Sequence, residues 1–449
     1  MASTYLSRTT GTPTQQNTWT WSAWVKFSDD NKVGATDSTL LSEYYNAGSY
    51  TKYERIANNV LRYGTGVSGH GSFVTTRRFS DLNAWYHLVI VNDWSNSTTA
   101  DRIKLYVNGV RETSFSSFTA PSSGSSRING DSEALRIGTI NNTLFFNGSM
   151  SHIHFIDGTV YDASAFGETD ATTGEWKIKT DVSVTYGNNG FFILKDGNSV
   201  TDQSGKGNNF TVGGGTLTKT EDNPSNVFCT MNPLDNHFAS STFSHGNNTV
   251  QTSTSNYTWN TGTLGMTSGK FYWEVKYSAN SNGDYYNLIG IADRPTDDIH
   301  DVLGRQTNCS NYGYYADNGG IYAKSTSITS YGNSYTVGDI VGVAVDLDNN
   351  KLYFSKNGTW QNSGVPTSGS TGTGAFSIDA ISSTITGVYF PASGDYGSSQ
   401  NATNQHNFGN GYFGTTAVSS AGSNASGNGI FEYDVPTGYT ALSTKGLNL

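Results

Sequence analysis

An alternation of apolar and polar residues with a period of two constrains this chain more than any other feature of its sequence. In the segment 18–28, every odd position from Trp19 to Phe27 is apolar and most even positions are polar, with Trp24 the exception. Such a period places alternate side chains on opposite faces of a β-strand. The pattern returns in three later segments, 103–107, 271–277 and 341–347. No segment of about 12 or more residues shows the apolar stripe of an amphipathic helix.

Tight turns follow several of these segments. Asn108-Gly109 comes after the strand predicted at 103–107, and Asn357-Gly358 comes after an apolar pair at Leu352 and Phe354. Asn-Gly pairs favour the two-residue turns of β-hairpins, because both residues tolerate a positive φ. Many short strands with turns between them predict an all-β fold of the sandwich or barrel type.

Charge and hydropathy exclude several classes of function. Among 449 residues, 26 Lys and Arg stand against 36 Asp and Glu, which gives a net charge of −10. The few basic residues are scattered, so the chain lacks the basic patch with which proteins bind nucleic acid. No run approaches the roughly 18 apolar residues that span a bilayer, and the first residues lack the pattern of a secretory signal. We therefore expect no nucleic-acid partner and no membrane insertion.

The chain holds two cysteines, Cys229 and Cys309. Two cysteines cannot form the disulfide framework of a small secreted domain, and neither stands in a metal-binding Cys-x-x-Cys pair. We expect two free, buried thiols, and a single bridge between them is the open alternative.

Two β-rich stretches resemble known families. The first half is similar to the laminin-G-like branch of the concanavalin A-like lectin/glucanase sandwiches. That resemblance rests on WTWSAWVKF (19–27), AWYHLVIV (84–91), IKLYVNGV (103–110), LRIG (135–138) and FNGSMSHIHFIDG (146–158). The second half resembles a SPRY domain, through SGKFYWEVKY (268–277), LIGIA (288–292), GYYADNGGIY (313–322), the long run 335–360 and GVYFPA (387–392). The resemblance implies two tandem antiparallel β-sandwiches of the concanavalin A-like, jelly-roll type.

A break in composition separates the two stretches. Residues 201–223 are rich in Gly, Asn and Asp, which is typical of a linker. We therefore expect a laminin-G-like sandwich at 1–200, a connector at 201–223, and a SPRY-like sandwich with a C-terminal extension at 224–449.

The order of the two domains resembles a type of virion protein found in tailed phages of marine bacteria. DNPSNVFCTMNPLDN (222–236), FGETD (166–170) and VPTGYTAL (435–442) match that type as well. The resemblance implies a tail-fibre, receptor-binding or capsid-decorating component, made in the host cytoplasm and exposed on the particle. Its implied partners are other virion proteins and a host-surface glycan or protein, and it implies a homo-oligomer such as a trimer.

Catalytic and metal-binding patterns are sparse. Glycosidases need two carboxylates about 5–10 Å apart, and the Asp346/Asp348 pair near the end of a predicted strand is better explained as turn chemistry. His152 and His154 would share one strand face, but zinc needs three or four ligands. Calcium stays an open alternative at scattered donors, namely Asp93, Asp131 and Asp157. No Gly-x-Ser-x-Gly elbow occurs. We expect no enzyme activity and no cofactor.

Binding suits the composition better than catalysis. Tyr with Ser, Gly and Asn forms adaptable contact surfaces at low entropic cost. The candidate contact residues lie in predicted loops and are Tyr44, Tyr45, Tyr50, Tyr285, Tyr286, Tyr331 and Asn333. The same tyrosines could instead pack against other subunits or cover the ends of a sandwich.

The leading hypothesis is a non-enzymatic phage virion protein that recognises a host-surface glycan or protein. A capsid-decorating subunit without a host ligand is the first alternative, and a polysaccharide depolymerase is the second. An intracellular adaptor, as for many SPRY proteins, is a more distant reading.

Overall fold

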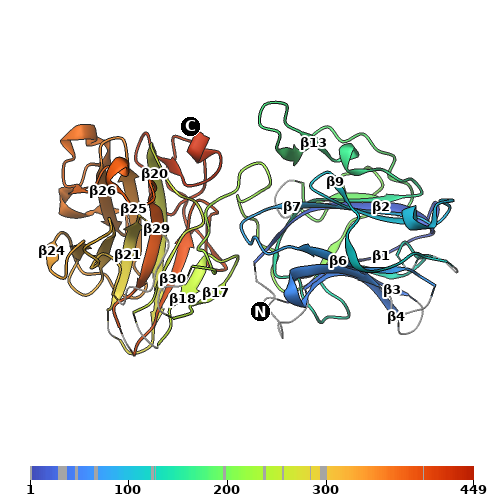
Figure 1. Ribbon diagram of the computed structural model, residues 1–449, viewed down its shortest axis with the longest axis horizontal. Coiled ribbons are helices and arrows are strands. Elements are labelled where there is room, and N and C mark those ends of the chain that lie inside the picture. The colour runs from blue at the N-terminus through green and yellow to red at the C-terminus, as the bar shows by residue number, and fades with distance from the viewer. Residues whose placement is uncertain are drawn as a thin grey trace. The chain divides into compact units, whose positions relative to one another are not determined.

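The computed structural model describes most of the chain, and it divides the chain into two compact units, Met1–Lys219 and Thr220–Leu449 (Figure 1). The described residues are 3–28, 38–45, 49–64, 69–122, 126, 128–195, 199–235, 239–254, 257–283, 285–293, 301–397 and 399–448, with backbone alone for 45, 49–52 and 54–57.

The first unit stacks two antiparallel sheets face to face, as Figure 1 shows for β2 and β7 above β3, β4 and β6. One sheet has the order β10 (Phe115–Thr119), β6 (Ser72–Arg78), β5 (Val60–Gly64), β4 (Ser49–Ile56), β3 (Ser38–Tyr45), β11 (Ala134–Ile137), β1 (Tyr5–Thr9), β16 (Thr211–Gly214). The other has the order β15 (Phe191–Ile193), β12 (Gly148–Asp157), β2 (Thr18–Phe27), β7 (Tyr86–Asp93), β8 (Ile103–Val107), β9 (Val110–Glu112). A separate hairpin pairs β13 (Gly167–Thr169) with β14 (Trp176–Ile178).

The period-two pattern of β2 places its odd positions in the core between these sheets. Trp19, Trp21, Ala23, Val25 and Phe27 are all 0% exposed and belong to that core. The even positions are buried too, because a second apolar cluster covers the outer face of this sheet. That cluster includes Phe166 and Trp176, from the irregular segment after β12. The sheet is therefore covered on both faces.

Part of the expected connector, residues 201–223, is ordered within the first unit. Its residues Thr211–Gly214 form β16, which pairs with β1 at the edge of the larger sheet. Asp202 fixes the preceding turn by accepting hydrogen bonds from the backbone N–H groups of Phe192, Ser204 and Asn208, at 2.8–2.9 Å. The Gly- and Asn-rich composition reflects these turns.

The second unit is also a two-sheet sandwich. The larger sheet runs β17 (Thr242–Ser244), β18 (Thr249–Gln251), β30 (Ala402–Asn407), β20 (Lys270–Asn280), β25 (Ile340–Asp346), β26 (Lys351–Lys356), β27 (Thr359–Trp360), with β28 (Phe376–Ser377) beside β26 and β33 (Thr440–Ala441) parallel to β20. The smaller sheet runs β19 (Trp259–Thr261), β29 (Phe390–Asp395), β21 (Asn287–Ala292), β22 (Tyr312–Tyr315), β23 (Gly320–Ala323), β24 (Ile328–Ser330). β31 (Tyr412–Phe413) and β32 (Thr416–Ala417) form a short hairpin.

The C-terminal segment covers the outer face of β20. Phe271, Trp273 and Val275 point into the core, as the alternation predicts. Tyr272 on the other face is also fully buried, because it packs with Phe431 and Tyr439. Both units therefore carry an irregular layer outside one sheet.

The helices of the described residues are short 3₁₀ turns: η1 (Ala57–Asn59), η2 (Thr99–Asp101), η3 (Ala163–Ala165), η4 (Gln361–Ser363), η5 (Pro366–Thr371), η6 (Ile381–Ser383) and η7 (Gly446–Asn448). Across the described part of the chain, none has the length and apolar character needed to cross a membrane. The predicted all-β class is confirmed.

Both cysteines are buried and neither takes part in a disulfide, as expected. Asp346 pairs with Lys270 at 2.9 Å and accepts the backbone N–H of Asn349, while Asp348 accepts that of Gly269. The contact with Asn349 confirms turn chemistry for Asp346, whereas Asp348 bonds the backbone of a residue 79 positions away in the chain.

His152 and His154 pack against the same ring, that of Phe192, with ring centroids 5.8 and 3.9 Å away, as their expected shared face predicts. A bulge interrupts the pairing of β12 with β2 between Ser151 and His154, and His152 has a φ of 48°. His154 is buried and bonds Tyr186 through Nδ1 at 2.8 Å, whereas His152 is half-buried. The two rings are therefore brought against Phe192 by an irregular stretch of β12 and not by regular alternation.

Candidate functional site

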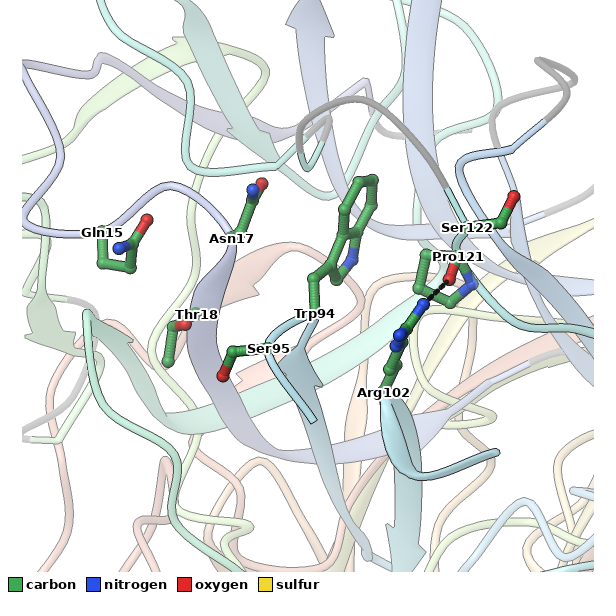
Figure 2. A pocket seen from close by; sticks show the side chains of 8 residues that line it. All are labelled: Gln15, Asn17, Thr18, Trp94, Ser95, Arg102, Pro121 and Ser122. Carbon is green, nitrogen blue, oxygen red and sulfur yellow. Dashed lines mark hydrogen bonds between the residues drawn. The ribbon is translucent and has the colours of Figure 1, made fainter. Parts of the chain in front are cut away.

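A polar pocket of about 400 Å³ opens in the first unit where three chain segments meet (Figure 2). The segments are the approach to β2, the turn between β7 and η2 continuing to the start of β8, and the chain after β10. The described lining residues are Gln15, Asn17, Thr18, Trp94, Ser95, Arg102, Pro121 and Ser122. Figure 2 shows Trp94 between Asn17 on one side and Arg102 with Pro121 on the other.

Hydrogen bonds fix the orientation of Trp94. Its indole Nε1 donates to Asn92 Oδ1 at 2.8 Å, and its backbone N–H donates to the carbonyl of Asn17 at 3.2 Å. The turn that carries it is closed by Asp93, whose carboxylate accepts from Ser95 Oγ at 2.6 Å and Asn96 Nδ2 at 3.3 Å. With its polar atom satisfied, the half-buried ring offers an apolar surface to the pocket.

Asn17 is held from its acceptor side. Its Oδ1 accepts the backbone N–H of Ser126 at 2.6 Å, and its carbonyl accepts Asn92 Nδ2 at 3.0 Å. Among the described residues its amide nitrogen has no hydrogen-bond partner. That nitrogen can therefore donate a hydrogen bond to a ligand. The exposed side-chain amide of Gln15 can form a second hydrogen bond to the same ligand.

Asp157 anchors the segment that carries Gln15 and Asn17. Its carboxylate is 1% exposed and accepts the backbone N–H groups of Thr14 and Gln15, at 2.6 and 3.1 Å. It also accepts Asn129 Nδ2 at 2.7 Å and the Asn189 N–H at 3.0 Å. These four donors occupy the carboxylate, so its role is to position the loop.

The other acids considered for calcium are also engaged by the protein. Asp93 closes the Trp94 turn, and Asp131 Oδ1 accepts from Thr12 Oγ1 and Ser132 Oγ at 3.3 and 3.4 Å. Within the described ranges, no three His, Cys, Asp or Glu side chains gather closely enough to hold a metal ion.

Arg102 supplies the positive charge of the pocket. Its Nε donates to the carbonyl of Asn96 and its Nη1 to the carbonyl of Pro121, each at 3.0 Å. Both acceptors are neutral, and in the described part of the chain no carboxylate lies within ion-pairing distance of this guanidinium.

A second hollow, of about 380 Å³, lies in the second unit beside Tyr285. Tyr285 is 39% exposed and Val337 is 43% exposed. The other described lining residues are Ser278, Ala279, Asn280, Gly283 and Thr336. Of the candidate contact residues whose side chains are described, Tyr285 is the one that lines either of these two pockets.

Tyr286 belongs to a different surface. It is half-buried and packs at 5.9 Å from the ring of Tyr396. The guanidinium of Arg305 lies 5.3 Å from the centre of the Tyr396 ring and 5.9 Å from that of Tyr322, and Nη1 donates to Tyr396 Oη at 3.1 Å. Tyr286 is therefore part of an aromatic cluster built around an arginine.

Tyr331 is a core residue and not a loop contact. It is 7% exposed, packs edge-on against Tyr314 and Phe354, and accepts the Phe354 backbone N–H at 3.3 Å. Asn333 nearby is exposed, and its backbone N–H donates to Gln361 Oε1 at 2.9 Å. The polar sequence around Tyr331 concealed its burial.

The remaining candidates lie on the hairpin of β3 and β4 in the first unit. Tyr44 is half-buried and pairs with Tyr50, and Tyr45 pairs with Ser49. The side chains of Tyr45 and Tyr50 lie outside the described residues. The structure thus places three of the seven candidates in the first unit and four in the second.

Sequence reasoning missed the pocket around Trp94. A signal was present, because Trp94 is an isolated aromatic in a run of Asn, Asp, Ser and Thr, residues 92–99. A large apolar ring in a segment with no other apolar residue has no strand face to fill. Such a residue is a candidate for ligand contact.

Two family models match the chain. One, described as the Concanavalin A-like lectin/glucanases superfamily, covers residues 2–164, and the other, the SPRY domain, covers residues 270–378.

Curated relatives align over a short segment. Ran-binding protein 9 of Danio rerio is 32% identical over 90 residues, which is 20% of this chain and 14% of that protein. The Ran-binding proteins 9/10 homolog of Drosophila melanogaster is 38% identical over 90 residues, or 20% of this chain and 9% of that protein. The matched segment thus spans less than a sixth of either relative.

Solved structures are similar at low identity. The SPRY domain of human HERC1 is 18% identical with a TM-score of 0.30, over 39% of this chain and 96% of that one. A putative carbohydrate binding protein from Bacteroides ovatus is 15% identical with a TM-score of 0.34, over 48% of this chain and 57% of that one. The two family matches thus make the first half of the chain similar to a concanavalin A-like domain and the second half similar to a SPRY domain.

Proposed function

We propose that this chain is a non-enzymatic binding protein that recognises a cell-surface saccharide through the pocket beside Trp94. The observation that carries the proposal is the lining of that pocket, which combines one indole ring with amide and guanidinium donors. Saccharides present both apolar C–H faces and hydroxyl groups. A mainly concave site with an aromatic surface and a few fixed polar groups suits such a ligand.

The pocket is organised before any ligand binds. Trp94 and Asn17 are each held by hydrogen bonds to the neighbouring loop, and Asp157 fixes the chain that leads to them. Side chains already in place lose little conformational entropy on binding. This rigidity supports recognition by a preformed site.

Binding is favoured over hydrolysis. The matching superfamily includes both lectins and glucanases, so a saccharide is the natural ligand class for either activity. A glycosidase needs a pair of carboxylates at the bond that it cleaves. The described lining residues include no carboxylate, which argues against a depolymerase at this pocket.

We further propose that the chain is a phage virion component, in a tail fibre or another receptor-binding appendage. The support is the order of the two domains and the shared sequence phrases. Many copies on one particle would convert weak single contacts into strong avidity. In this proposal the SPRY unit contacts other virion proteins, and assembly as a homo-oligomer such as a trimer stays a prediction.

Counting copies of the chain in purified particles by quantitative mass spectrometry tests its place in the virion. A number in step with tail proteins supports the receptor-binding role. A number in step with the major capsid protein supports capsid decoration instead, and absence from the particle contradicts the virion proposal.

Saccharide binding is tested with a glycan array that includes host surface polysaccharide. We expect the wild-type chain to bind a subset of glycans and Trp94→Ala to reduce that binding at least tenfold. Tyr285→Ala is the matched control, because it removes an exposed aromatic ring from the pocket of the other unit. Loss of binding in Tyr285→Ala alone would move the site to the second unit, and no binding by the wild type would refute the proposal.

A further inference from the structure

The pocket beside Trp94 is positively charged in a chain of negative charge. The chain carries a net charge of −10, and yet Arg102 is the one charged residue among the described lining residues. A positive charge in a pocket whose described lining holds no negative charge favours a negatively charged ligand over a neutral one.

The charge of Arg102 is not neutralised within the described part of the chain. The two nearest acids in sequence are already engaged: Asp93 accepts from Ser95 and Asn96, and Asp101 pairs with Arg111. The two contacts of the Arg102 guanidinium go to main-chain carbonyls, those of Asn96 and Pro121. These contacts fix the plane of the group and leave its full charge available.

Donors remain free after those contacts. A guanidinium has five N–H groups in a rigid fork, and Arg102 uses two of them. The remaining N–H groups match the two oxygens of a carboxylate better than they match single hydroxyl groups, and a charge-assisted pair of this kind is about twice as strong as a neutral hydrogen bond. Because the side chain is half-buried and already oriented, such a pair would form with little further ordering.

We propose that this pocket binds an acidic sugar, a glycosyl residue that carries a carboxylate. The sugar ring lies against the indole of Trp94, the carboxylate pairs with Arg102, and Asn17 Nδ2 donates to a hydroxyl or ring oxygen. This inference rests on the proposed saccharide binding and specifies the class of ligand.

Matched ligands test the charge without altering the protein. The full-length chain is titrated by isothermal calorimetry with oligosaccharides containing glucuronate, galacturonate or sialate, and with their neutral methyl esters. We expect at least one acidic oligosaccharide to bind at least tenfold more tightly than its ester. We also expect its affinity to fall as salt concentration rises, whereas that of the ester stays level.

Variants then assign the effect to one residue. Arg102→Gln should lower the affinity for the acidic oligosaccharide at least tenfold and leave that for the ester within twofold, while Arg102→Lys should show an intermediate loss. Lys104→Gln is the matched control, because it removes the same charge two residues away from Arg102 and outside the lining. Circular dichroism of each variant checks that it is folded. The comparison of acid with ester uses the wild-type chain, so it tests the inference even if a variant fails to fold.

The possible outcomes distinguish a failure of the acidic-sugar inference from a failure of the proposed saccharide binding. Equal affinity for acid and ester, with binding still lost in Trp94→Ala, would overturn the acidic ligand and keep saccharide binding. Preference for sulfated over carboxylated sugars would overturn the inference that the bound group is a carboxylate. No binding of any oligosaccharide would overturn saccharide recognition itself.

Discussion

The buried acid Glu43 fixes, through its hydrogen bonds, a loop that is linked to the pocket beside Trp94. Its side chain is 0% exposed and accepts the backbone N–H groups of Asn129 and Gly130, at 2.8 and 2.6 Å. Burial raises its pKa from about 4.5 to about 7, against the opposite effect of those two hydrogen bonds. Asn129 in turn donates to Asp157 and to the carbonyl of Gln15, so Glu43 is linked to the pocket.

The raised pKa predicts a pH dependence of stability. Between about pH 4.5 and about pH 7 the unfolded chain has released the proton that the folded chain still holds. The free energy of unfolding of the first unit should therefore fall as pH rises through this range, by about 3.5 kcal/mol at about 1.4 kcal/mol for each pH unit, and then level off. Glu43→Gln, which has no proton to lose, should remove this part of the slope.

Scanning calorimetry of the full chain between pH 4.5 and pH 8 measures the effect. The matched control is Glu274→Gln in the second unit, where burial also raises the pKa of the carboxyl to about 7. Each substitution should flatten the pH dependence of a different transition. An unchanged slope in Glu43→Gln would contradict the assignment.

Only part of the site could be predicted residue by residue. Residue type indicated that Tyr, Asn and Ser loops suit binding, and Tyr285 does line a pocket. Residue type could not separate Tyr331, which fills the core, from Tyr285, because both follow polar residues in loop-like sequence. Arg102 and Trp94 line one pocket because the loop between them closes, and a local sequence pattern carries no information about that arrangement.

At the scale of elements, alternation predicted the strands but not what covers them. The odd positions of β2 and β20 point into the two cores, as expected. The alternation gives no sign that their even positions are covered as well, yet Tyr272 and Glu274 are 0% exposed. The covering segments have no regular period, so nothing in a period-two pattern reveals them. Glu274 accepts the backbone N–H groups of Glu432 and Tyr433 at 2.9 and 2.8 Å, which ties one such segment to the sheet.

We expect this C-terminal layer to contribute strongly to the stability of the second unit. Tyr439 is 2% exposed, packs with Tyr272 and Tyr353, and donates to the carbonyl of Pro366 at 3.1 Å. Tyr439→Ala should lower the free energy of unfolding by about 3 kcal/mol, because it leaves a cavity against the sheet. Leu447→Ala, at a position 37% exposed, should change it by less than about 0.5 kcal/mol. Urea denaturation followed by tryptophan fluorescence compares them, and equal effects would contradict a packed outer layer.

For the whole molecule, the division into two units predicts two independent folding reactions. The last buried residue in the apolar clusters of the first unit is Phe210. The first buried residue in those of the second unit is Phe228. Each unit therefore has a complete core of its own, and each has more than the roughly 100 residues at which a sandwich buries enough surface to fold.

Separate expression of residues 1–219 and 220–449 tests that independence. The cut keeps β16 with β1, whereas a cut at residue 200 would remove the edge strand and should destabilise the first fragment. We expect each fragment to show one cooperative thermal transition within a few degrees of a transition of the full chain. The 1–219 fragment should also retain the saccharide binding of the pocket beside Trp94. A fragment that unfolds without a cooperative transition would mean that its core is completed by the other half, and binding by 220–449 alone would place recognition in the second unit.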